Sequence, residues 1–277
     1  MQPEPIVMDG PALVFGGPYS NLQATGAVLA EARRLGVPPG RAVCTGDVVA
    51  YCGDALATAE LVRRSGIHVV MGNCEESLGN EAAECGCGFE AGTACARLAV
   101  EWYRHANRAL DGASRAWMRG LPRRIDIVIA GRTLAAIHGG VAKINRYIFA
   151  STPEAEKRAE ISAAGCDGMI GGHCGLPFTQ IDGGKLWHNP GAIGLPANDG
   201  TPRVWYSLLT PTREGLRIEH RALDYPHRDA ARTMRAAGLP EGYAAALSSG
   251  IWPSCDVLPA EERRAQGQPI MPGIVTW

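Results

Sequence analysis

The feature that most constrains the fold is the repetition of short apolar runs, Gly-rich turns and helical segments in the first third of the chain. Apolar runs cover residues 12–15, 43–45 and 67–71, and segments with helical spacing cover residues 22–35 and 54–64. This order predicts parallel strands joined by helices, and such sheets carry their sites at the carboxyl ends of the strands. Asp47 and Asn73 lie at two of those ends.

The rest of the chain divides into a helical excursion, further strands and a tail without motifs. We predict strands at 125–130, 133–137, 168–171, 178–181, 185–188, 204–209 and 216–223, and a helix near 153–164. Residues 1–225 are expected to form one domain with a helical insertion at about 80–121 that covers the site. Residues 226–277 are expected to form a helical or irregular C-terminal extension.

Polar motifs follow four of the predicted strands. They are Gly46-Asp47, Gly72-Asn73-Cys74-Glu75-Glu76, Ile137-His138-Gly139-Gly140 and Gly171-Gly172-His173-Cys174-Gly175. Two histidines with neighbouring glycines, a carboxylate and an amide form a ligand set that suits Fe, Mn or Zn. The alternative is that His138 and His173 are a hydrogen-bonded pair in the core.

In order and spacing these motifs resemble the calcineurin-like metallophosphoesterases. That family has five blocks, Asp-x-His, Gly-Asp, Gly-Asn-His-Asp/Glu, a lone His and Gly-His-x-His, which hold two metal ions. The resemblance runs from about residue 14 to 209 and includes Asn189-Pro190-Gly191 and Asn198-Asp199-Gly200, typical of the small bacterial phosphodiesterase-like branch. It implies an α/β fold of two mixed β-sheets packed face to face and flanked by helices, with a small-molecule substrate.

The departures from the family pattern fall on one of its two metal sites. Gly17 and Tyr19 stand where Asp and His belong, and Gly175 stands where the final His belongs. The resemblance implies that Asp47, Asn73, His138 and His173 bind the other metal, so we predict one divalent transition metal ion. Asn198 also stands where the branch usually has an Arg that contacts phosphate.

Three residues beside the predicted ligands are candidates for catalysis. Cys74 replaces a family His, and its thiol is either a nucleophile, a soft ligand or a filler in a dead site. Glu75 matches the acidic position of the family block. Tyr19 is expected to fill the space of the lost metal and to point its hydroxyl at the remaining ion.

Composition and net charge limit which partners and which cellular location we expect for the protein. The net charge of −1 gives no reason to expect nucleic acid or an anionic membrane as a partner. Because the start of the chain has no basic and apolar leader, we expect a cytoplasmic protein, in which nine cysteines form no disulfide framework. A separate zinc site involving Cys85 and Cys87 is a lesser alternative, and homo-oligomer formation stays open.

Three functions are compatible with these observations. The favoured one is hydrolysis of a phosphate mono- or diester by a metal-dependent enzyme with one ion. The second is a mononuclear non-haem iron enzyme that performs redox or carbon-centred chemistry, since two histidines and a carboxylate also hold Fe(II). The third is a non-catalytic protein that binds a metal or ligand, because fold alone does not establish function.

Overall fold

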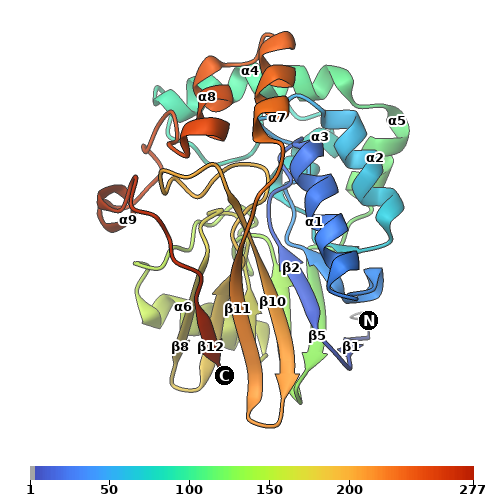
Figure 1. Ribbon diagram of the computed structural model, residues 1–277, viewed down its shortest axis with the longest axis vertical. Coiled ribbons are helices and arrows are strands. Elements are labelled where there is room, and N and C mark those ends of the chain that lie inside the picture. Colours follow the sequence, from blue (N-terminus) through green and yellow to red (C-terminus); the bar gives the residue numbers. More distant parts are fainter. Residues whose placement is uncertain (1–3) are drawn as a thin grey trace.

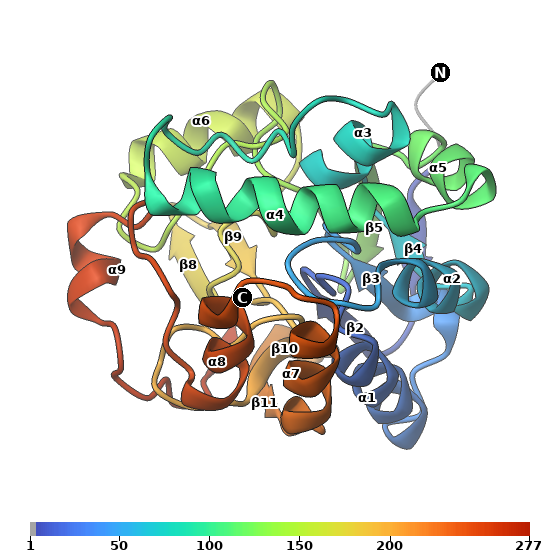
Figure 2. The ribbon, with the colours of Figure 1, turned by 90° about the horizontal axis from the view of Figure 1, so that it is seen from above.

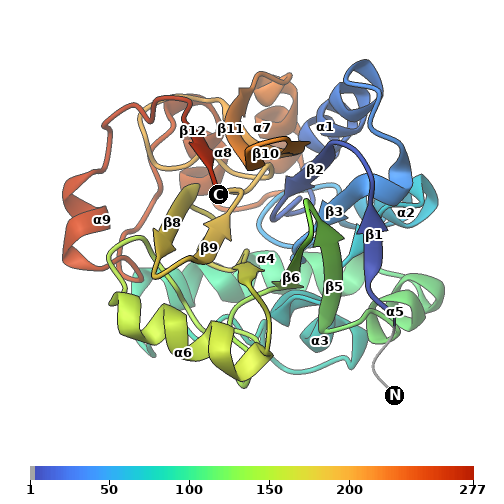
Figure 3. The ribbon, with the colours of Figure 1, turned by 90° about the horizontal axis from the view of Figure 1, so that it is seen from below.

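Two six-stranded β-sheets pack face to face, and helices cover their outer faces, in the computed structural model of the protein, which describes residues 4–277 (Figure 1). Seen from below, β10, β11 and β12 lie on one side and β5, β6, β8 and β9 lie on the other (Figure 3). The predicted fold class is therefore confirmed.

Each sheet mixes parallel and antiparallel strands. The first sheet has the order β1 (Ile6–Met8), β5 (Arg124–Ile129), β6 (Arg132–Ile137), β7 (Gly168–Ile170), β9 (Lys185–Asn189) and β8 (Phe178–Asp182). The second has the order β12 (Ile274–Thr276), β11 (Gly215–Leu223), β10 (Val204–Thr212), β2 (Ala12–Phe15), β3 (Ala42–Cys44) and β4 (His68–Val69). Strands β2, β3 and β4 are parallel, as are β6, β7 and β9.

Successive side chains of a strand point to opposite faces of the sheet, so the strands contribute residues to two separate cores. Val14 and Val43 point into an apolar layer between the sheets, where they meet the inward-facing isoleucines of β5. Phe15 and Cys44 point to the other face, against the helices. Cys44 is therefore the buried core residue that its position inside a predicted strand indicates.

The α-helices of the described residues are α1 (Leu22–Arg34), α2 (Ala55–Ser65), α3 (Asn73–Gly79), α4 (Ala94–Ala109), α5 (Gly112–Arg119), α6 (Glu154–Ala164), α7 (His227–Ala236), α8 (Glu241–Ser249) and α9 (Ala260–Arg264). The helices predicted at 22–35, 54–64 and 153–164 are present with similar bounds as α1, α2 and α6, and the six others in this part of the chain had no predicted bounds. The side chain of Asn21 accepts a hydrogen bond from the backbone N–H of Ala24, which caps α1. None of the helices within residues 4–277 is long and apolar enough to cross a bilayer.

The helical insertion and the C-terminal segment both lie at the end of the sheets where the site forms. From above, α4 runs across the molecule, with α3 and α6 on one side and α7 and α8 on the other (Figure 2). The boundary at residue 225 stays a prediction. The C-terminal segment also adds a strand to the second sheet, where Val275 of β12 pairs with Ile218 of β11.

Three local expectations are wrong. The strand predicted at 67–71 is a two-residue strand, because Met71 donates its N–H to the carbonyl of Pro122 outside the sheet. The short strands β1 and β12 were not predicted, since each has three residues and too little pattern to recognise. A disulfide joins Cys85 to Cys87 where none was expected, which leaves neither sulfur free to bind zinc.

Candidate metal centre

Four polar side chains meet where the carboxyl ends of parallel strands from both sheets come together. Asp47 follows β3, and Asn73 is the first residue of α3 after β4. His138 follows β6, and His173 follows β7. The backbone N–H of His173 donates to the carbonyl of His138, which ties the two histidine turns together. The sequence motifs are thus brought to one place by the order of the strands.

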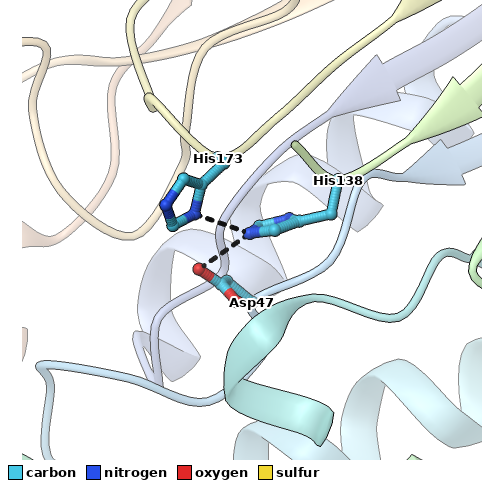
Figure 4. A group of neighbouring side chains, drawn as sticks. All are labelled: Asp47, His138 and His173. Carbon is cyan, nitrogen blue, oxygen red and sulfur yellow. Dashed lines mark hydrogen bonds and ion pairs between the residues drawn. The ribbon is translucent and has the colours of Figure 1, made fainter. Parts of the chain in front are cut away.

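The potential ligand atoms converge on one nitrogen. His138 Nε2 lies 3.3 Å from Asp47 Oδ2, 3.0 Å from Asn73 Oδ1 and 2.9 Å from His173 Nδ1. Figure 4 shows Asp47, His138 and His173 pointing toward one another. Asp47, His138 and His173 are buried and present one ligand atom each within 4.8 Å of the others. Asn73 is also buried, at 1% exposure.

The hydrogen bonds around this cluster leave lone pairs facing one another. His138 Nδ1 lies 2.7 Å from the carbonyl oxygen of Thr45, so this nitrogen carries the proton in the neutral ring and Nε2 carries a lone pair. The Asn73 amide nitrogen donates to the carbonyl of Cys85 at 3.0 Å, which turns the amide oxygen toward the cluster. In the neutral state of His138, its Nε2 and the oxygens Asp47 Oδ2 and Asn73 Oδ1 are three lone-pair atoms facing one another, an arrangement that fits a bound cation.

Burial and the neighbouring charges shift the pKa values of the cluster's members in different directions. Burial opposes the ionised form of Asp47, but the neighbouring His138 outweighs it and lowers the pKa of the carboxyl to about 2. Burial opposes the charged form of His138, but Asp47 raises its pKa above the ordinary value. Burial and then His138 lower the pKa of His173 to about 3. Asp47 is therefore ionised and His173 neutral at physiological pH, as metal ligands must be.

Glu75 holds the Asp47 loop in place. Its carboxylate accepts hydrogen bonds from the backbone N–H groups of Gly72 (2.9 Å), Asp47 (2.8 Å) and Val48 (2.8 Å). Asp47 has a φ of 56°, an unfavourable left-handed conformation that these bonds support. Burial, followed by the charge of Asp47, raises the pKa of Glu75 to about 7. Glu75 thus lies behind the ligands and orients one of them.

Tyr19 occupies the region of the three replaced family ligands. A Cβ atom added at Gly17 would lie within 2.6 Å of three atoms of the Tyr19 ring. A Cβ atom added at Gly175 would lie 3.2 Å from the Tyr19 hydroxyl. Gly17 and Gly175 therefore both lie against the Tyr19 side chain. Burial and then Asp47 raise the pKa of the phenol well above 10, so Tyr19 stays neutral and can donate a hydrogen bond.

Cys74 is beside the ligands in an environment that favours the neutral thiol. Its backbone N–H donates to Asp47 Oδ1 at 3.1 Å, and the Asn73 amide lies 3.5 Å from its sulfur. Burial, followed by the Asp47 and Glu75 carboxylates, raises the pKa of this thiol well above its usual range. Its role as a nucleophile stays a prediction. Cys174 accepts from the Asn189 amide at 3.1 Å and packs in an apolar cluster.

Two residues at the site could not have been found from the motifs. Thr45 orients His138 through its backbone carbonyl, which every residue type possesses. Tyr147 packs on His173 with ring centroids 4.1 Å apart, but it follows β6 in a loop without any recognisable pattern. His188 follows a different course and contacts the Thr179 hydroxyl at 2.8 Å.

Comparison with known proteins agrees with this fold. The profile of the calcineurin-like phosphoesterase superfamily domain matches residues 20–212, and the chain belongs to this superfamily. A metallophosphoesterase from Sphaerobacter thermophilus has 23% identity and a TM-score of 0.67, covering 87% of this chain and 99% of that one. A hypothetical protein from Pyrococcus horikoshii has 16% identity and a TM-score of 0.73, covering 89% and 99%. No curated protein matches the chain significantly.

Proposed function

We propose that the chain is a hydrolase of phosphate esters that uses one divalent metal ion held by Asp47, Asn73, His138 and His173. The observation that carries the proposal is the gathering of four potential ligand atoms, with His138 Nε2 within 3.3 Å of the other three. Tyr19 fills the neighbouring region, which supports one ion rather than two. Membership of the phosphoesterase superfamily supports the reaction class.

An ion bound by these residues would polarise a phosphoryl oxygen and lower the pKa of a water molecule. The chain's own groups then orient the reactants. Thr45 fixes the ring of His138, and Glu75 fixes the backbone of Asp47. The neutral hydroxyl of Tyr19 lines the same pocket as His173, where it can donate a hydrogen bond to an ester oxygen.

A mononuclear iron enzyme is the second candidate. Two histidines and one carboxylate within 4.8 Å form a ligand set that also holds Fe(II) with open positions. The walls beside His173 are largely aromatic, which suits carbon-centred chemistry on an apolar substrate. Metal identity separates this candidate from hydrolysis.

The test is metal analysis of protein purified both anaerobically and in air, together with turnover of an activated phosphodiester. We expect one equivalent of Zn or Mn, and hydrolysis that depends on it. His173→Ala should lose most of the metal, whereas the control His68→Ala, which alters a histidine bonded to the Gly40 carbonyl, should keep it. Two equivalents, or none, would contradict the proposal, and redox-active Fe without hydrolysis would favour the second candidate.

A further inference from the structure

An aromatic pocket opens directly beside His173. Its ring-bearing walls are Tyr19, Tyr51, Phe89, Tyr147, Tyr243 and Trp252, and we call it the aromatic pocket. The pocket has about 50 Å³ of space that water centres can reach, several times the roughly 10–15 Å³ that one water needs. It therefore has room for a small group beside His173.

The walls of the aromatic pocket are held by contacts among themselves. Tyr51 lies 4.9 Å from Tyr19 and 4.9 Å from Tyr243, measured between ring centroids. Tyr147, which also lines the pocket, packs against His173. Phe89 comes from the helical insertion, and Tyr243 from the C-terminal segment. The pocket thus combines residues of the family core with residues from the insertion and the C-terminal segment.

Asn198 positions one of these walls. Its side-chain oxygen accepts a hydrogen bond from the backbone N–H of Trp252 at 2.8 Å. The indole N–H of Trp252 donates to the carbonyl of Pro196 at 2.6 Å, which fixes the orientation of the ring. Asn198 stands where the family branch usually has an Arg. At this position the chain therefore supports an aromatic surface and supplies no cation.

The charge of the pocket limits the charge of its ligand. Among the residues described, none that lines the aromatic pocket is Lys, Arg, Asp or Glu. The exposed Lys143 affects the pKa of His173 but is not part of the lining. One divalent ion and ionised Asp47 leave a net charge of at most +1 at the ligand cluster, because the Glu75 carboxyl lies behind Asp47 and can only lower this charge. A monoanion neutralises this charge, whereas a dianion leaves a buried negative charge without a partner, which is costly.

We infer that the aromatic pocket receives the aryl group of a monoanionic phosphodiester. The inference rests on the proposed hydrolysis and specifies its substrate class. Water forms a new bond to phosphorus as the bond between phosphorus and the aryloxy oxygen breaks. The aryl alcohol leaves with one proton, and the phosphate monoester leaves after releasing the other proton to solvent. Stacking against flat aromatic walls favours this group over an alkyl group of similar size.

The test measures binding of three compounds and follows the hydrolysis of each compound in the same samples. Protein loaded with Zn is titrated by calorimetry with phenyl methylphosphonate, ethyl methylphosphonate and phenyl phosphate at pH 7.5. The first two compounds are monoanions, and only the first of them has an aromatic ring. The third compound has the same ring but is a dianion. We expect phenyl methylphosphonate to bind about tenfold more tightly than the ethyl compound, since aromatic contacts supply this much affinity. It should also bind more tightly than phenyl phosphate.

Variants then assign the preference to the pocket. Trp252→Ala should abolish the advantage of the phenyl compound and leave binding of the ethyl compound unchanged, whereas Trp252→Phe should keep most of it. The control Trp117→Ala alters a tryptophan that lines a different pocket, and it should retain the full preference.

Equal or tighter binding of phenyl phosphate, no gain from the ring, or equal losses for both monoanions in Trp252→Ala would each overturn the inference. The predicted selectivity without any hydrolysis of methyl phenyl phosphate would support the pocket and contradict the proposed function. The inference about the aromatic pocket and the proposed hydrolysis can therefore be refuted independently of each other.

Discussion

The contact between Gly17 and the Tyr19 ring predicts that substitutions at these positions depend strongly on each other. An aspartate at position 17 has no room while the tyrosine is present, because its Cβ would lie within 2.6 Å of three ring atoms. Tyr19→His removes the phenol ring and opens the space. We therefore compare wild type, Gly17→Asp, Tyr19→His and the double variant in a thermodynamic cycle.

The magnitude follows from two separate costs. Gly17 has a φ of 35°, and a side chain in this left-handed region costs about 1–2 kcal/mol. Overpacking against a buried ring costs a further ~1–3 kcal/mol. Gly17→Asp should thus lower the free energy of unfolding by roughly 2–5 kcal/mol in wild type, but by only about 1–2 kcal/mol in the Tyr19→His background. The coupling energy should be about 1–3 kcal/mol.

Urea unfolding of the four metal-free proteins measures this coupling from the midpoints at constant m-value. Effects that add to within about 0.5 kcal/mol would refute the packing argument. When Gly175→His is added to the double variant, we expect a second Mn or Zn ion to bind and hydrolysis of an activated phosphodiester to rise by about tenfold or more. A variant that folds, binds two ions and gains no activity would show that the lost ligands do not explain the divergence.

Three further results are expected. Glu75→Gln presents an amide to backbone N–H groups, so unfolding by urea should show a loss of about 1–3 kcal/mol; an unchanged midpoint would contradict the role of Glu75. Because the proton on His138 competes with metal and Asp47 raises its pKa, calorimetric Zn affinity should increase as the pH rises from 6 to 8, and a flat profile would count against the ligand assignment. Burial raises the pKa of the thiols of both Cys74 and Cys44, so mass-spectrometric mapping of the metal-free protein should show equally slow alkylation; faster labelling of Cys74 would indicate a thiolate that the described environment does not favour.

The parts of the fold that the sequence predicted are those with strong local patterns. In β5, buried and less buried residues alternate along the sequence, so the strand can be recognised from its own residues. Helix α1 can be recognised in the same way from its cap and its apolar spacing. The motifs also predicted that Asp47 and His138 approach each other, because both follow strands whose carboxyl ends meet. Three-residue strands such as β12 carry no comparable pattern, since their stability comes from pairing with a distant strand.

The aromatic pocket is the part of the site that the sequence does not reveal. Trp252 is far from every motif in the chain, and it reaches the pocket only because Asn198 and Pro196 hold it there. The same applies to Glu75, whose acidic character suggested a reacting group. Its bonds to backbone N–H groups become visible only when the turn at Asp47 is folded.

Anomalous diffraction from crystals grown with Mn or Zn tests the central claim most directly, because it locates ions without reference to activity. We predict one peak, with Asp47, Asn73, His138 and His173 as its protein ligands and the Tyr19 ring still in the neighbouring region. A second peak about 3.5–4 Å from the first, the spacing of two-metal sites, would contradict the single-ion account. So would a single ion bound elsewhere with these four side chains unchanged.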